Sequence, residues 1–424
     1  MRWGEGLARA AAAFARGTLA SAMQVAPSKP AGSRLRVLHV GPLYVNHLRR
    51  WAEHAAALGC TVSAAGHVRP KRRPIELTDV ADHVEIAPEG LWELGTARRV
   101  AWLMSVLRRL QPDLLHAHWL PTWGYFATLS GHRPLVVTPW GSDLYLARGA
   151  ERKRADRALR SADGVLARSP HMLRNILARG ASAERIHRVD LGVDLGRFRP
   201  ASPGEQARAR HELDLPAGPI ILSFRAGTPL YNLDTVLEAF RMLRARLPDA
   251  TLLMLHGGAP LSRPLRASLH GLDESDGIRL VGDLPHANMR WYLTAATAGV
   301  SIPSSDGSPS SVWEALACGL PVVLSDLPQM EERLGESEAV RLVEPRPETV
   351  ASALYDVLAH PRLQDGMARA ARAWAVENAD EREQVARLGR VYATMQRGSV
   401  ARQEAPSGVR QPPATSATRA AAPS

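Results

Sequence analysis

The segment from Ser301 to Asp326 combines residue types that could hold a phosphorylated sugar. A Gly/Ser/Pro loop carries one carboxylate, Asp306, and a short predicted helix carries a second, Glu314, eight residues later. Ser308 is placed to cap this helix, and Pro309 suits its first turn. The start of the helix would then present unpaired backbone N–H groups with partial positive charge, where a phosphate can bind without a metal. These N–H groups belong to Ser310, Ser311 and Val312.

Glu314 lies one turn into the predicted helix, where its carboxylate can accept hydrogen bonds from two vicinal hydroxyls. A ribose presents such a pair, so this segment predicts a phosphorylated sugar as its ligand. The alternative is an ordinary strand-loop-helix unit in which Glu314 is only solvated.

Short apolar runs alternate with amphipathic stretches from residue 34 onward, which is typical of a parallel sheet covered by helices. The alternation restarts after a Pro-rich stretch near residue 200, and 424 residues exceed the roughly 250 to 300 that one core holds. We therefore predict an α/β protein with two Rossmann-like, doubly wound domains that face each other across a cleft. The predicted parts are a flexible extension (1–33), the two domains (34–199 and 200–380), a final helix (381–396) and a disordered tail (397–424).

Positive charge is concentrated in the first half of the chain, where residues 1–200 contain 30 Lys or Arg against 16 Asp or Glu. This bias allows peripheral contact with an anionic membrane, although Arg-rich genomic composition also explains it, because only three residues are Lys. Nucleic-acid binding is not predicted, because aromatic residues are not interleaved with the basic ones. No apolar run approaches the roughly 20 residues that span a bilayer, and two distant cysteines favour a reducing compartment. We therefore predict a cytoplasmic protein.

The segment around the two carboxylates resembles the E-x7-E segment of family 4 of the GT-B glycosyltransferases. The matching positions are Gly307, Glu314, Ala315, Ala317, Gly319, Pro321, Val322 and Ser325. The resemblance implies that Asp306, where the family usually has Glu, contacts the donor sugar and that Glu314 holds the nucleotide ribose. It also implies that the final helix packs back onto the first domain.

Two further segments of the second domain resemble donor-binding segments of this family. The resemblance implies that Arg225 contacts the donor diphosphate, as does a Lys at the next helix in most members. Here Tyr231 and Asn232 stand where Lys-Gly is usual, so either they supply hydrogen bonds instead or turnover is weak. Gly257 lies in a stretch similar to the family's Gly-x-Gly-Pro loop, where the backbone approaches the nucleotide; an ordinary turn is the alternative.

In the first domain, the resemblance places the turn after the first strand next to both substrates. Gly41 would give this tight turn, and Asn46 and His47 would lie at the following helix start, in either a capping or a catalytic role. Asp143, His118 and His116 are titratable candidates beside the acceptor, where Trp140 replaces the family's frequent His. The candidate catalytic residues are thus Asp306, Arg225, Asp143 and His118.

The resemblance implies a retaining glycosyltransferase that moves a hexose from a nucleoside diphosphate sugar to a glycan or lipid-linked acceptor. Envelope or exopolysaccharide biosynthesis is the expected setting. The chain contains no Asp-x-Asp pair and no His/Cys cluster with metal spacing, so we predict no metal and no other cofactor. The missing Lys and the Trp140 substitution support an alternative, a catalytically silent protein that binds a sugar nucleotide as a partner or scaffold. An epimerase on the same fold is a third option.

Overall fold

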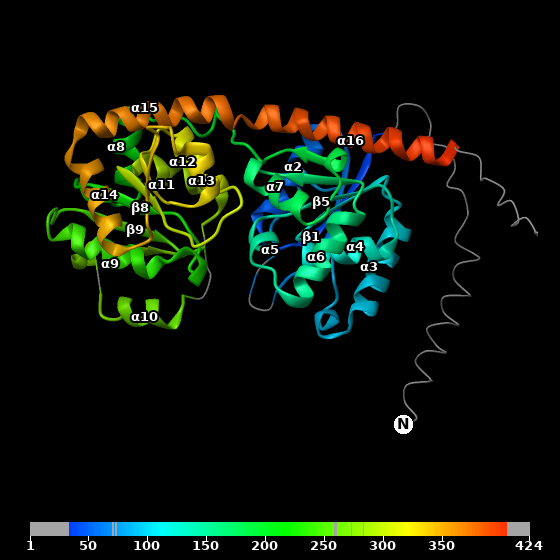
Figure 1. Ribbon diagram of the computed structural model, residues 1–424. Coiled ribbons are helices and arrows are strands. Elements are labelled where there is room, and N and C mark those ends of the chain that lie inside the picture. The colour runs from blue at the N-terminus through cyan, green and yellow to red at the C-terminus, as the bar shows by residue number, and fades with distance from the viewer. Residues whose placement is uncertain are drawn as a thin grey trace, which may run out of the picture. The chain divides into compact units, whose positions relative to one another are not determined.

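The computed structural model describes residues 34–69, 72, 74–257, 261–272, 274–282 and 284–404 (Figure 1). The predicted extension 1–33 therefore falls outside the described residues. The strands of the described part form two separate parallel sheets. This arrangement confirms the predicted α/β class with two Rossmann-like domains. The change of sheet occurs between Arg188 and Ile220, so the expected boundary near residue 200 lies in the connecting segment.

The first sheet has seven strands in the order β3-β2-β1-β4-β5-β6-β7, all parallel. Its apolar central strands are buried on both faces because helices cover both sides of the sheet. The strands are β1 (Arg36–Pro42), β2 (Thr61–His67), β3 (His83–Ile86), β4 (Leu114–His118), β5 (Leu135–Thr138), β6 (Gly164–Ala167) and β7 (Ile186–Arg188). The helices are α2 (Asn46–Ala57), α3 (Thr96–Leu110), α4 (Tyr125–Ser130), α5 (Ser142–Tyr145), α6 (Gly149–Ser161) and α7 (Pro170–Ala178), with a π-helix at Leu120–Gly124.

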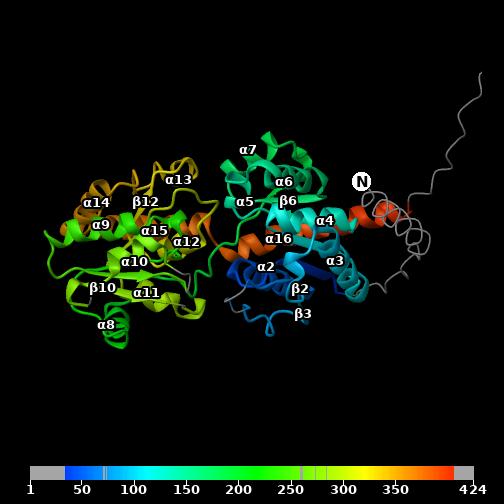
Figure 2. The same ribbon diagram turned by 90° about the horizontal axis from the view of Figure 1, so that it is seen from below.

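The second sheet has six parallel strands in the order β10-β9-β8-β11-β12-β13. Two apolar clusters, one on each face, form its core, and α9 and α14 lie side by side on one of them (Figure 2). The strands are β8 (Ile220–Ser223), β9 (Thr251–Leu255), β10 (Ile278–Val281), β11 (Ala298–Ser301), β12 (Val322–Ser325) and β13 (Val340–Val343). The helices are α8 (Pro203–Glu212), α9 (Leu233–Arg244), α10 (Arg263–Leu269), α11 (Met289–Ala295), α12 (Ser310–Ala317), α13 (Pro328–Leu334), α14 (Pro347–Ala359) and α15 (Pro361–Asn378).

The final helix, α16 (Glu381–Glu404), packs against α2 and β4 of the first sheet. It continues past residue 396, so the predicted start of a disordered tail at 397 is wrong: eight more residues are helical, and no proline interrupts residues 397–404. Residues 405–424 lie outside the described part. Within that part, no helix has the length and apolar content needed to cross a membrane.

The chain crosses between the two domains twice, and backbone hydrogen bonds join the two crossing segments. The Val193 amide donates to the Ala379 carbonyl at 2.6 Å, and the Glu381 amide donates to the Val193 carbonyl at 3.0 Å. Gly192, with φ of +66°, allows this approach, because a Cβ there would lie 2.6 Å from the Glu381 Cα. The segment leaving the first sheet and the segment entering α16 are therefore fixed to each other.

Candidate active site

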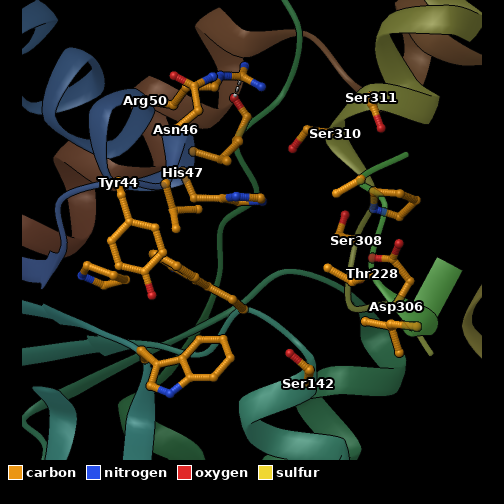
Figure 3. Close-up of a pocket in the computed structure, with 18 of the residues that line it drawn as sticks. Tyr44, Asn46, His47, Arg50, Ser142, Thr228, Asp306, Ser308, Ser310 and Ser311 are labelled. Carbon is orange, nitrogen blue, oxygen red and sulfur yellow. Dashed lines mark hydrogen bonds between the residues drawn. The ribbon is translucent and has the colours of Figure 1, made fainter. Parts of the chain in front are cut away.

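A cavity of about 620 Å³ lies where strand ends of the two sheets meet. Its walls come from the segments after β1 to β7 on one side and after β8, β10 and β11 on the other. Figure 3 shows Tyr44, Asn46 and His47 on one wall facing Asp306, Ser308, Ser310 and Ser311 on the other. This is the position where parallel α/β sheets bind ligands.

Helix α12 begins at Ser310, and its first turn is organised differently from the prediction. Pro309 is the cap residue, while the Ser308 hydroxyl donates to Asp190 Oδ2 at 2.5 Å, so the predicted capping by Ser308 is wrong. The Val312 amide donates to the Pro309 carbonyl at 2.9 Å and is not available to a ligand. Within the described part of the chain, the amides of Ser310 and Ser311 have no protein acceptor.

Glu314 lines the cavity although it is only 2% exposed. Its Oε1 accepts a hydrogen bond from His286 Nε2 at 2.9 Å and from Arg50 Nη1 at 3.4 Å. Arg50 also donates to the Gly192 carbonyl at 2.8 Å and to Glu381 Oε1 at 3.1 Å. These partners fix the orientation of the carboxylate and offset the cost of burying its charge.

Arg225 lies opposite the first turn of α12 and joins three side chains of the cavity wall. It donates to Asp306 Oδ2 at 2.5 Å and to Ser311 Oγ at 3.0 Å, and its guanidinium lies 4.2 Å from the centre of the Tyr231 ring. Tyr231 therefore stacks on the cation, at the position where the resemblance implies a Lys in most members. The Asp306 Oδ1 accepts from the Gly307 amide at 2.7 Å, which holds the loop.

A buried ionic network that the sequence analysis did not predict supports this loop from behind. Arg168 donates to Asp190 Oδ1 at 2.8 Å, to the Ser308 carbonyl at 2.8 Å and to Ser310 Oγ at 3.1 Å. Arg333 donates to Asp190 Oδ2 at 3.3 Å. Burial alone would raise the pKa of Asp190, but the charges of Arg168 and Arg333 and the Ser308 hydroxyl lower this pKa to about 2. Asp190 is therefore ionised at neutral pH.

His47 lies in the cavity with its ring stacked on Trp140, the ring centres being 5.3 Å apart. Burial and then the positive charges of Arg168, Arg50 and Arg225 lower the pKa of His47 to about 3. His47 is therefore neutral, and the three guanidinium groups near it provide positive charge for an anionic ligand. The α2 helix has no side-chain cap, so the capping role considered for Asn46 and His47 is not found; both line the cavity.

The structure does not bring the three titratable candidates Asp143, His118 and His116 to the cavity lining. The Asp143 carboxylate is 2% exposed and accepts from the amides of Leu120, Trp140 and Gly141 at 2.8 to 2.9 Å, so it shapes a loop. His118 is fully buried in the sheet, with its Nε2 3.1 Å from His39 Nδ1. The predicted contact of Asp143 and His118 with substrate is corrected accordingly: the Asp143 carboxylate is occupied by amides of its own loop, and the His118 side chain lies inside the core of the sheet.

Three predicted donor-binding residues do not line the cavity: Gly41, Asn232 and Gly257. Gly41 lies within β1, where a Cβ would come 2.6 Å from Leu48 Cδ1, so close packing rather than a turn requires it. Asn232 has φ of +47°, and its side chain donates to the Ile302 carbonyl and the Ser304 hydroxyl at 2.9 Å. Gly257, with φ of +59°, does not line the cavity, and residues 258–260 lie outside the described part.

The cavity thus brings together Arg225, Tyr231, Asp306, Ser308, Ser310, Ser311 and Glu314 from the predicted set. Sequence reasoning missed Arg50, Arg168 and His286. Arg168 directly follows β6, and a cation at the carboxyl end of a parallel strand is a signal that could have found it. Arg50 and His286 carry no local signal, because they meet Glu314 only through the packing of distant segments.

Comparison with known proteins agrees with this architecture. A model described as Glycosyltransferase Family 4 matches residues 45–197, and a model described as Glycosyl transferases group 1 matches residues 206–374. The D-inositol 3-phosphate glycosyltransferase of Streptosporangium roseum is 30% identical over 308 residues, which are 66% of this chain and 69% of that protein. The GDP-mannose-dependent alpha-(1-6)-phosphatidylinositol monomannoside mannosyltransferase of Mycolicibacterium smegmatis is 26% identical over 284 residues, 64% of this chain and 72% of that protein.

Among solved structures, the Anabaena protein HepE in complex with UDP-glucose superposes with a TM-score of 0.71. Its sequence identity is 16%, and the match covers 85% of this chain and 100% of that chain. The two sheets and the cavity at their strand ends therefore define a GT-B glycosyltransferase. Within this class, the chain belongs to glycosyltransferase family 4, and it is a transferase enzyme.

Proposed function

We propose that the protein is a retaining glycosyltransferase that moves a hexose from a nucleoside diphosphate sugar to a hydroxyl of a glycan or lipid-linked acceptor. The observation that carries this proposal is the placement of Glu314, one turn from the unpaired Ser310 and Ser311 amides, on a cavity lined by Arg225 and Arg168. Anionic, diol-bearing ligands fit this combination.

The donor is assigned to the second-domain wall. Its diphosphate would lie between the start of α12 and Arg225, its ribose against Glu314, and its sugar near Asp306. The names of the relatives support a nucleotide-sugar donor, since one relative is GDP-mannose dependent and the HepE structure contains UDP-glucose. The acceptor would approach from the first-domain wall, and glycan assembly for the envelope or for export is the proposed setting.

The proposed step needs no protein base. The bond between the anomeric carbon and the diphosphate oxygen breaks, and the acceptor oxygen forms the new bond on the same face. The acceptor proton moves to the departing phosphate oxygen, while Arg225 and the helix start stabilise the negative charge on this group. Positive charge is thus supplied by the protein, and we propose that no metal is required.

The test is a nucleotide-binding measurement on Glu314→Gln, with Glu338→Gln as a matched control because Glu338 is exposed. Calorimetric titration of UDP, GDP and their sugars should show affinity weakened roughly 10- to 100-fold in Glu314→Gln, because charge-assisted hydrogen bonds to the ribose are lost. Unchanged affinity would overturn the site assignment. Donor binding without product, over long incubation with an acceptor mixture, would favour a catalytically silent binding protein.

A further inference from the structure

The first-domain wall of the cavity is lined by aromatic rings that the proposed donor site does not use. We call this set the aromatic wall: Tyr44, His67, Trp92, Trp119, Trp123 and Trp140. The chain has ten tryptophans, and four of them face this one cavity. Trp123 is only 1% exposed and belongs to the core, but Trp92, Trp119 and Trp140 are partly exposed and present ring surface to the cavity. Partly exposed rings that converge on a cavity indicate a ligand with a flat apolar face.

The rings form two groups on this wall of the cavity. Trp92 is stacked on His67 with ring centres 4.2 Å apart and an 18° angle between the planes, and Trp123 follows at 5.2 Å from Trp92. At the other end, Trp119 meets Trp140 edge to face at 5.8 Å. Trp119 has φ of +74°, a conformation that is rare for a bulky residue and clusters at functional sites.

Polar groups interrupt the apolar surface, and one of them has a fixed direction. The Trp123 indole N–H can only donate, and it lies 3.3 Å from His67 Nδ1, so this nitrogen accepts and the proton of a neutral His67 is on Nε2. Burial and then the charges of Arg69 and Arg99 lower the pKa of His67 to about 4, which keeps the ring neutral. His67 therefore offers a hydrogen-bond donor beside the stacked rings, and Asn46, Thr122 and Ser142 add polar groups to the lining.

A pyranose ring has the chemistry that matches this surface: C–H bonds on its faces and hydroxyls around its rim. A hydrocarbon chain would leave the polar groups of the wall without partners. We infer that the aromatic wall is the acceptor subsite and that it takes a sugar ring, so the acceptor is a molecule that already carries a sugar. This inference rests on the proposed function, because it assigns the acceptor of the same reaction.

The test separates a ring from a chain with matched probes. Octyl β-glucoside, octyl β-mannoside and octyl β-galactoside are compared with 1-octanol, which shares the chain but lacks the ring, below micelle-forming concentrations. We expect at least one glycoside to quench tryptophan fluorescence saturably and, in the presence of donor, to accept a sugar, while 1-octanol does neither. Equal binding of 1-octanol, or no binding of any glycoside, would overturn the inference.

Substitutions then assign the binding to the wall. Trp92→Leu removes the flat ring but stays apolar, Trp92→Phe keeps a ring, and Trp291→Leu is the control because Trp291 is 37% exposed on α11. Trp92→Leu should weaken glycoside binding and raise the acceptor KM roughly tenfold, from the loss of one stacking contact. Trp92→Phe should recover most of this loss, and nucleotide affinity should be unchanged in all three variants.

The two proposals fail in different ways. Loss of glycoside binding in Trp92→Phe as severe as in Trp92→Leu, or unchanged binding in Trp92→Leu, would refute the aromatic subsite while leaving the donor site intact. Absence of nucleotide binding in the unmodified protein would refute the proposed function, and the fluorescence titration would still decide whether the wall takes a sugar ring.

Discussion

Arg225 illustrates how one side chain organises the donor wall. Its planar guanidinium reaches Asp306 and Ser311 at the same time and lies over the Tyr231 ring. A lysine carries the same charge but is a single point on a flexible chain, so it cannot make these contacts together. The site therefore depends on the planar geometry of the Arg225 guanidinium more than on its charge.

We therefore predict that Arg225→Lys lowers kcat/KM about 100-fold, which is typical for the loss of one positioned donor to developing charge. The measurement is initial-rate kinetics with a labelled sugar nucleotide. Arg246→Lys is the matched control, because Arg246 also stacks on a tyrosine, Tyr355, outside the cavity lining. A loss of less than threefold in Arg225→Lys would show that charge alone suffices.

Among the individual site residues, sequence analysis could place on the cavity those that lie close to one another along the chain. Asp306, Ser310, Ser311 and Glu314 lie in one segment, so spacing alone placed them on the cavity. Arg50 is held to Glu314 across 264 positions, a distance that spacing cannot bridge. Asp143 was assigned wrongly because a carboxylate after a strand looks the same in sequence whether it faces substrate or binds the amides of its own loop.

At the scale of elements, Asp190 connects the end of the first sheet to the loop before α12. It is buried between Arg168 and Arg333 and accepts the Ser308 hydroxyl, so removal of its charge would leave two guanidiniums poorly compensated. We predict that Asp190→Asn lowers the free energy of unfolding by about 3 kcal/mol. Urea denaturation measures this. Glu344→Gln, which breaks an ion pair with Arg346 in which both side chains are 64% exposed, should cost less than about 1 kcal/mol, and equal effects would contradict the prediction.

The pairing of β1 with β4 places three histidines in the core: His39, His116 and His118. His116 Nδ1 lies 2.8 Å from the Tyr392 hydroxyl, and its Nε2 lies 2.6 Å from Thr138 Oγ1. Burial, followed by the neighbouring histidines, lowers the pKa of all three; the pKa of His39 falls to about 3. They are therefore neutral in the folded protein at pH values where the unfolded chain binds protons.

Stability should consequently fall as pH drops below about 6.5, with a slope near 1.4 kcal/mol per pH unit for each such histidine. The sign follows because the unfolded state binds more protons than the folded state in this range. Urea unfolding at pH 7.0, 6.0 and 5.0 measures the slope. His118→Gln should make it shallower, whereas His270→Gln, on the exposed surface, should not; identical slopes in all variants would exclude the buried histidines as the cause.

For the whole molecule, the order of elements could be predicted because alternating strand and helix patterns dictate parallel sheets. The end of α16 could not be predicted from the sequence, because a solvated helix rich in Arg and Gln has a composition similar to that of a disordered tail. The position of the cavity followed from topology, but its aromatic side did not, because Trp92, Trp123 and Trp140 come from separate connections and show no common spacing.

Peripheral contact with an anionic membrane stays a prediction, and α6 is the element on which to test it. Its exposed cations are Arg152, Lys153, Arg154, Arg157 and Arg160, and Leu146, just before this helix, is 46% exposed. We predict that the protein floats with phosphatidylglycerol vesicles at low salt and that reversal of charge at 152, 153 and 154 weakens binding at least tenfold, given about 1 kcal/mol per basic residue. Equal flotation with neutral vesicles would contradict an electrostatic contact.

The backbone hydrogen bonds of Val193 to the residues flanking Asp380 have a mechanical consequence. Both chain crossings are joined at Val193, so we expect the cavity to widen by rotation of the domains about this point. The same hydrogen bonds would oppose sliding of one cavity wall past the other. Nucleotide binding and release of the glycosylated product would then depend on the same rotation, and a more rigid hinge at Val193 would slow both steps.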